Sequence, residues 1–144
     1  MMSSFEGRFA RRSVSSPPVL DTPEGIRATI HRLVKERLVY PVFQPVVNLA
    51  AGHFYGYEGL IRPLPQTGLQ SPLQLLAAAH EFGLAFEVEH LALETVANAF
   101  VARELPGRLF INISPSALLA CYDQGHLLSE PLALGLEPEQ VVLE

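Results

Sequence analysis

Apolar residues recur every three or four positions in several segments of the chain, which is the spacing of a helix face. The first such segment, 23–38, follows Asp-Thr-Pro-Glu (21–24), which offers a capping residue, a proline for the first turn and an early carboxylate. These features predict a helix that begins near Pro23. The same spacing predicts further helices over 71–82, 85–104, 114–120 and about 124–135.

Two segments after the first predicted helix are rich in β-branched and aromatic residues instead. Residues 40–49 and 54–61 are typical of strands, and the Ala-Ala-Gly-His sequence between them is typical of a turn. We therefore expect a β-hairpin. Pro41 and Pro45 cannot donate a backbone hydrogen bond, so the first strand should lie at a sheet edge or at an irregular position.

Two short apolar segments later in the chain, 108–113 and 140–144, are typical of buried strands. They alternate with the predicted helices, and this alternation indicates parallel strands joined by right-handed crossovers. The predicted fold class is therefore α/β, with a β-hairpin followed by alternating helices and parallel strands.

Three polar residues interrupt or end these apolar strands. Glu58 lies within the hairpin, whereas Asn112 and Glu144 lie at the carboxyl ends of the later strands. Burial of a lone carboxylate is costly unless it is paired or binds a metal, and α/β folds gather their sites at the carboxyl ends of strands. Two carboxylates and an amide oxygen would suit Mg²⁺ or Mn²⁺. From spacing alone, residues that cap helices or contact water are the commoner explanation.

Several other polar residues have simpler explanations. Glu87 and Glu89 flank an apolar helix face and are expected to be solvated. Ser114 precedes a proline at the start of a predicted helix and is expected to cap it. Lys35 is the only lysine of the chain, and it is expected on the solvated face of the first helix.

Composition narrows the class of partner and the compartment. The 144 residues are 49% hydrophobic and carry a formal net charge of -5, which argues against general binding of DNA or RNA. The single cysteine, Cys121, has no internal disulfide partner and favours a reducing compartment such as the cytoplasm.

No apolar run approaches the roughly 20 residues of a membrane span. Residues 1–20, rich in Ser and Pro, are expected to form a disordered tail or linker.

One string of the sequence resembles the opening of EAL domains. It is FQPVVNLAAGHFYGYEGLIRP (43–63), which matches a Gln-Pro-aliphatic strand, a Gly-containing turn and then Glu-Ala-Leu-x-Arg. Three later strings resemble further landmarks of the same family in the same order: SPLQLLAAAHEFGL (71–84), FINISPSAL (110–118) and VVLE (141–144). Because four motifs agree in sequence order, the resemblance covers residues 40–144.

The resemblance implies a modified TIM barrel, of which residues 40–144 would be the N-terminal part, preceded by a connector helix over 21–39. EAL domains hydrolyse cyclic di-GMP to linear pGpG with Mg²⁺ or Mn²⁺, so the resemblance implies a role in bacterial cyclic di-GMP signalling. By position it assigns two sets of residues: the metal ligands Glu58, Asn112 and Glu144, and the dinucleotide contacts Gln44, Leu60 and Arg62.

Two departures from the family pattern limit what is expected of this chain. Gly59 replaces the signature alanine, a change that the strand should accept with some loss of rigidity. The family's general-base lysine and later acidic residues have no counterpart up to Glu144, so we expect a truncated domain that is catalytically inactive by itself. The alternatives are a degenerate domain that binds cyclic di-GMP without hydrolysis and a protein-interaction module. An open sheet edge would favour a homodimer.

Overall fold

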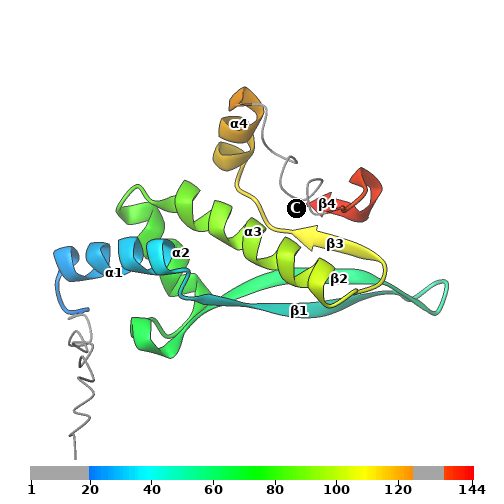
Figure 1. The fold of residues 1–144 in the computed structure, drawn as a ribbon, viewed down its shortest axis with the longest axis horizontal. Helices are drawn as coiled ribbons and strands as arrows, with labels where there is room; N and C mark the ends of the chain where they lie inside the picture. The colour runs from blue at the N-terminus through cyan, green and yellow to red at the C-terminus, as the bar shows by residue number, and fades with distance from the viewer. Residues whose placement is uncertain (1–19, 125–134) are drawn as a thin grey trace, which may run out of the picture.

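A four-stranded sheet and the helices packed on it form the core of the computed structural model, which describes residues 20–124 and 135–144 (Figure 1). The predicted tail over 1–20, apart from its last residue, and all but the ends of the helix predicted over 124–135 lie outside the described residues. The elements are α1 (Pro23–Glu36), β1 (Val39–Asn48), β2 (His53–Pro63), η1 (Pro65–Thr67), α2 (Pro72–Glu81), α3 (Ala85–Ala102), β3 (Arg108–Ile111), α4 (Pro115–Gln124), η2 (Pro138–Gln140) and β4 (Val141–Leu143).

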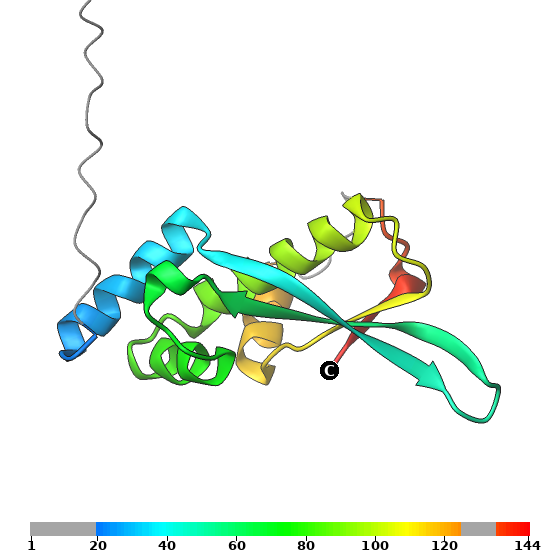
Figure 2. The ribbon, with the colours of Figure 1, turned by 90° about the horizontal axis from the view of Figure 1, so that it is seen from below.

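The strands of the sheet lie in the order β1-β2-β3-β4. β1 and β2 form the predicted antiparallel hairpin, and β2, β3 and β4 run parallel to one another. The predicted α/β fold class is thus confirmed. β1 lies at an edge of this sheet, as expected from Pro41 and Pro45. The tip of the hairpin extends well beyond the helices (Figures 1 and 2).

The two faces of the sheet differ because α3 covers one of them. Gly59 of β2 pairs with Ile111 of β3, and a Cβ built on Gly59 would lie 2.9 Å from Val96 Cβ of α3. The side of the sheet on which Gly59 and Ile111 lie therefore faces α3. Successive strand residues point to opposite faces, so Glu58 and Phe110, which pair with each other, point away from α3.

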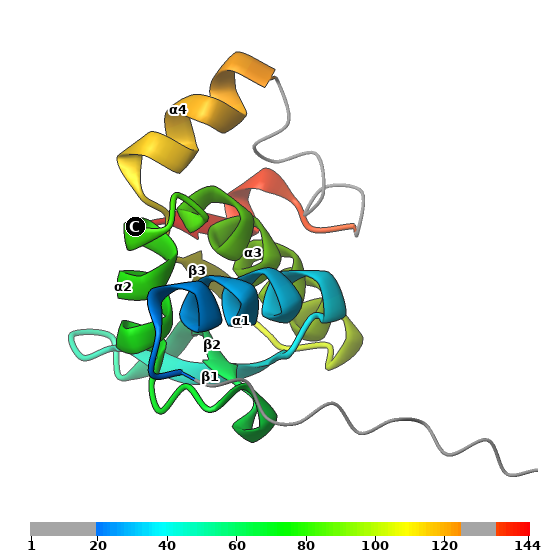
Figure 3. The ribbon, with the colours of Figure 1, turned by 90° about the vertical axis from the view of Figure 1, so that its left-hand side faces the viewer.

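α1 packs against α2 and α3, and α4 contacts α3 but lies away from α1 (Figure 3). The apolar face predicted for the first helix supplies the contacts of α1, since Ile30 and Leu33 are fully buried. The start of α1 is also as predicted, because the Thr22 hydroxyl accepts a hydrogen bond from the Gly25 N–H at 3.1 Å. None of the described helices is both long and apolar enough to cross a membrane.

Two helices end two residues earlier than their apolar spacing predicts. α1 ends at Glu36 because Arg37 adopts the left-handed conformation with φ 54°, and α3 ends at Ala102, before Glu104 with φ 50°. After α1, the Arg37 and Leu38 N–H groups donate back to carbonyls of the last turn, at 3.3 and 2.9 Å. This hydrogen-bond pattern closes a helix, and it usually has glycine at the left-handed position. Arg37 and Glu104 are not glycines, so the sequence does not indicate a helix end at these positions.

Candidate functional site

Two of the three predicted metal ligands are in direct contact. Asn112 lies just beyond the end of β3, and its Nδ2 donates a hydrogen bond to Glu58 Oε1 at 2.7 Å. Glu58 lies in the middle of β2, and its register partner is Phe110, two residues before Asn112. Glu58 and Asn112 therefore share the face of the sheet that points away from α3.

Glu144 lies beside Asn112 at the end of the neighbouring strand. Ile111 and Leu143 are paired, so Asn112 and Glu144 each follow a paired position. The Glu144 N–H donates to the Ile111 carbonyl, and the Glu144 carbonyl accepts from the Ile113 N–H, both at 2.9 Å. The strand register thus brings all three predicted ligands to one region of the sheet.

The predicted dinucleotide contacts lie around this region on β1 and β2. Gln44 is the exposed register partner of Glu58. Leu60 and Arg62 follow on β2 and are half-buried, and Arg62 Nη1 donates to the carbonyl of the preceding residue at 3.0 Å. Leu60, Arg62 and Asn112 also line a pocket of ≈ 210 Å³, but this pocket lies between β2, β3, α2 and α3, on the side of the sheet opposite to Glu58.

The exposure of the predicted ligands differs from expectation. Carboxylates within apolar strands are expected to be buried, but Glu58 is only half-buried, and Asn112 and Glu144 are exposed. This expectation is wrong, because α3 covers the opposite face of the sheet. Strand register, rather than the cost of burial, brings the three residues together.

The oxygen atoms of these residues fit a hard divalent cation. Glu58 and Glu144 offer carboxylate oxygens, and Asn112, whose Nδ2 faces Glu58, keeps its amide oxygen as an acceptor. Within the described part of the chain, no three His, Cys, Asp or Glu side chains form a group that could hold a metal ion. Metal binding here therefore needs the amide oxygen of Asn112 as well as the carboxylates.

Glu89 makes contacts that the sequence does not predict. It was expected to be solvated, but it is half-buried on α3, and its Oε2 accepts hydrogen bonds from the Ser114 N–H at 3.0 Å and the Ser114 hydroxyl at 2.9 Å. The Ser114 Oγ also accepts from the Ala117 N–H at 3.2 Å, which confirms Ser114 as the cap of α4. The contact joins residues 25 positions apart, so no local pattern signals it.

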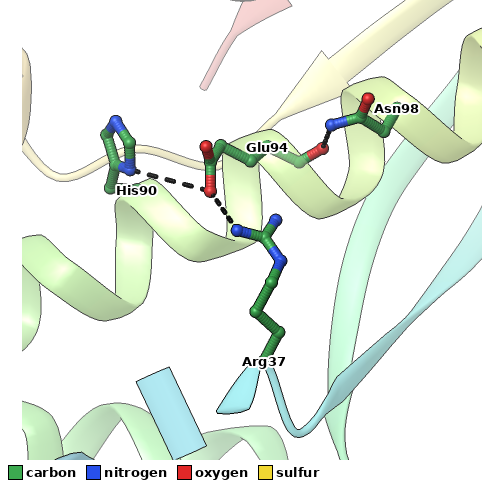
Figure 4. A network of polar contacts seen from close by, with 4 residues as sticks. All are labelled: Arg37, His90, Glu94 and Asn98. Carbon is green, nitrogen blue, oxygen red and sulfur yellow. Dashed lines mark hydrogen bonds and ion pairs between the residues drawn. The ribbon is translucent and has the colours of Figure 1, made fainter. Parts of the chain in front are cut away.

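A second cluster of polar residues joins α3 to the residue that follows α1 (Figure 4). Arg37 Nη1 lies 2.7 Å from Glu94 Oε2, and His90 Nδ1 lies 4.0 Å from the same oxygen. Asn98 donates to the Glu94 carbonyl at 2.8 Å. These contacts connect the C-terminal end of α1 to α3 and include none of the predicted site residues.

The chain also matches a known family. The sequence model of the EAL domain family matches residues 27–144. This chain belongs to the EAL domain family. The match begins inside α1 and contains all of the predicted site residues. No curated protein shows a significant match to the chain.

Solved EAL domains share the fold. The FimX EAL domain from Pseudomonas aeruginosa bound to c-di-GMP is 27% identical with a TM-score of 0.68, and the match covers 82% of this chain and 48% of that chain. Klebsiella pneumoniae BlrP1, in a manganese/cy-diGMP complex, is 31% identical with a TM-score of 0.54, covering 74% of this chain and 26% of that one. Vibrio cholerae LapD bound to c-di-GMP is 14% identical with a TM-score of 0.64, covering 90% of this chain and 32% of that one, and supports the fold alone.

The chain spans about half the length of the FimX chain and less of the other two. The expected architecture, the N-terminal part of an EAL-type barrel that starts with a β-hairpin, is confirmed by these matches.

Proposed function

We propose that this chain forms part of a cyclic di-GMP site of the EAL type, with Glu58, Asn112 and Glu144 as ligands of Mg²⁺ or Mn²⁺. The observation that carries the proposal is the 2.7 Å hydrogen bond from Asn112 Nδ2 to Glu58 Oε1, beside Glu144 and on the open face of the sheet. The bond turns the amide oxygen away from the carboxylate that it would otherwise repel. The c-di-GMP bound to the FimX EAL domain and the manganese in the BlrP1 complex support the ligand class.

In this proposal Gln44, Leu60 and Arg62 contact the dinucleotide. Arg62 suits a phosphate oxygen because its planar guanidinium carries a permanent charge and several parallel donors. Its present hydrogen bond to its own backbone is a single contact at 3.0 Å and leaves other N–H groups for a ligand. Leu60 offers an apolar surface between Glu58 and Arg62 on the same strand.

The bound metal would polarise the phosphodiester and lower the pKa of the attacking water. Proton removal also needs a general base. The resemblance to EAL domains implies that this base is a lysine, and the only lysine of the chain, Lys35, is exposed on α1. We therefore expect the 144-residue chain to bind metal and dinucleotide without hydrolysing the dinucleotide by itself. The retention of all three ligands favours a phosphodiesterase as the parent domain over a receptor that binds without turnover.

Titration calorimetry with cyclic di-GMP in the presence of Mn²⁺ tests the proposal. The wild-type chain should release or absorb heat that saturates, and Glu58→Gln should weaken binding by at least tenfold, because the amide loses the charge that attracts the cation. Glu36→Gln is the matched control, since Glu36 is exposed in the last turn of α1. Equal affinity for the Glu58→Gln and wild-type chains would refute the assignment of Glu58, and hydrolysis by the wild-type chain would refute the expected inactivity.

The alternative is that the chain is a protein-interaction module. Its partner would then be a second copy of the chain, which would cover the open face of the sheet in a homodimer. A folded chain that gives no heat with the dinucleotide but has a dimeric mass in light scattering would favour this alternative. A monomeric mass would contradict the homodimer.

A further inference from the structure

Glu89 has an unusual position for a helix carboxylate, because it joins α3 to the start of α4. A single oxygen, Oε2, accepts from both the backbone N–H and the hydroxyl of Ser114. The same hydroxyl caps α4 through the Ala117 N–H and lies 3.0 Å from the Ser116 Oγ. A carboxylate that accepts from the first residues of a helix also interacts favourably with the helix dipole. Glu89 therefore fixes the position at which α4 begins.

The segment that leads into α4 carries the proposed ligand Asn112. The backbone of Glu144 holds the residues on both sides of Asn112, because it exchanges hydrogen bonds with Ile111 and Ile113 at 2.9 Å. Asn112 thus lies between two residues that hydrogen-bond to the end of the β4 segment, and Glu89 of α3 holds the next residue along, Ser114, where α4 begins.

We propose that Glu89 is a positioning residue: by holding Ser114, it sets the turn that presents the Asn112 amide to Glu58 and to the metal. The inference rests on the proposed function, because that function makes Asn112 a ligand. It goes further in assigning a role to a residue on a helix that contributes no ligand. Glu89 and Asn112 line the same ≈ 210 Å³ pocket, so a shift of the turn would alter the pocket and the ligand together.

The positioning of Asn112 by Glu89 depends on the two hydrogen bonds to Ser114 more than on the charge of the carboxylate. The side-chain oxygen of a glutamine could accept the same two hydrogen bonds from Ser114, whereas alanine could accept neither. Loss of the outer partner of a metal ligand typically weakens metal binding by about 10–100-fold. Glu89 acts on Asn112 only through Ser114, so Glu89→Ala should weaken Mn²⁺ binding by about tenfold, the lower end of this range, and Glu89→Gln should restore most of the binding. Ser114→Ala keeps the N–H contact to Glu89 but loses the hydroxyl contact and the cap of α4, so its effect should fall in between.

The first test observes Asn112 directly and needs no metal. In the metal-free chain, the side-chain amide proton of Asn112 that donates to Glu58 should resonate downfield of a free amide in ¹H–¹⁵N spectra. It should move toward the free position in Glu89→Ala and stay close to the wild-type position in Glu89→Gln. Glu87→Ala is the control, because Glu87 is an exposed acid on the same helix and its removal changes the charge equally.

The second test titrates the same chains with Mn²⁺. Binding is measured by the paramagnetic broadening of the same amide signals. An Asn112 signal that stays at the wild-type position in folded Glu89→Ala and Ser114→Ala chains would overturn the proposal. A signal that moves in both chains, together with a wild-type chain that binds no Mn²⁺, would support the positioning role and refute the proposed metal site instead. If Glu89→Ala does not fold, Ser114→Ala and Glu89→Gln carry the comparison.

Discussion

The close approach of β2 and α3 at Gly59 can be tested by restoring the alanine of the family signature. An alanine Cβ at this position would lie 2.9 Å from Val96 Cβ, 3.1 Å from Val96 Cγ2 and 3.2 Å from Leu109 Cδ1. The nearest atom is the first atom of a helix side chain, which no change of rotamer can move. Gly59→Ala therefore requires β2 or α3 to shift, whereas the sequence alone suggested that glycine and alanine are nearly equivalent here.

Two opposing contributions determine how much Gly59→Ala changes the free energy of unfolding. Extra atoms in a packed core typically cost about 1–3 kcal/mol, and Gly→Ala returns about 0.4–1 kcal/mol by restricting the unfolded chain. The midpoints give a net destabilisation of about 1.3 kcal/mol. Gly59 and Val96 both line the ≈ 210 Å³ pocket, so a shift of β2 or α3 into this space would bring the cost toward the lower end of the range.

Urea unfolding, followed by circular dichroism, measures the free energies of wild-type, Gly59→Ala, Val96→Gly and doubly substituted chains. Val96→Gly removes the clashing Cβ at its own cost in burial and helix propensity, so the double variant should be more stable than the sum of the two single effects predicts, by about 1 kcal/mol or more. Additive effects, or a Gly59→Ala chain at least as stable as the wild type, would refute the clash.

Two further predictions concern helix ends. Ser71→Ala should destabilise the chain by about 1 kcal/mol in the same urea assay, because the Ser71 hydroxyl caps α2 by accepting from the Gln74 N–H at 3.2 Å. An unchanged unfolding midpoint would show that water replaces this cap. Glu104→Gly should stabilise the chain by about 0.5–1 kcal/mol, because φ is 50° and glycine avoids the left-handed penalty at some cost in unfolded-state entropy. Gly83 already occupies the equivalent position after α2, so a destabilised Glu104→Gly chain would mean that the glutamate side chain stabilises the end of α3.

The sequence predicts those parts of the fold that depend on local chemistry. The hairpin follows from two β-rich segments around a turn, and the edge position of β1 follows from Pro41 and Pro45, which lack the donor that an interior strand needs. The ends of α1 and α3 were placed two residues too late, because Leu38 continues the apolar spacing although Arg37 has already left the helix. A left-handed arginine or glutamate is held by the surrounding hydrogen bonds, which spacing does not reveal.

The sequence predicts three polar residues that the structure brings together, but it does not predict their environment. Glu58, Asn112 and Glu144 were found as polar residues in or at the ends of apolar strands, and the strand register brings them together. Their exposure was not predicted, because it depends on which face of the sheet α3 covers. The contact of Glu89 with Ser114 was missed for a related reason. Both results depend on how distant segments pack, and residue spacing reports only on neighbours along the chain.

The projecting hairpin has a practical consequence for work with this protein. Its tip lies at the start of β2, away from Asn112 and Glu144 at the carboxyl ends of the strands (Figure 1). Leu49 is 89% exposed there, and nothing lies within 4 Å of a Cβ built on Gly52. Exposed loop tips of this kind accept inserted sequence with little effect on the rest of a domain. A fluorescent label or an affinity tag introduced at residues 49–51, before Gly52 with its φ of 65°, would therefore report on the protein away from the proposed site.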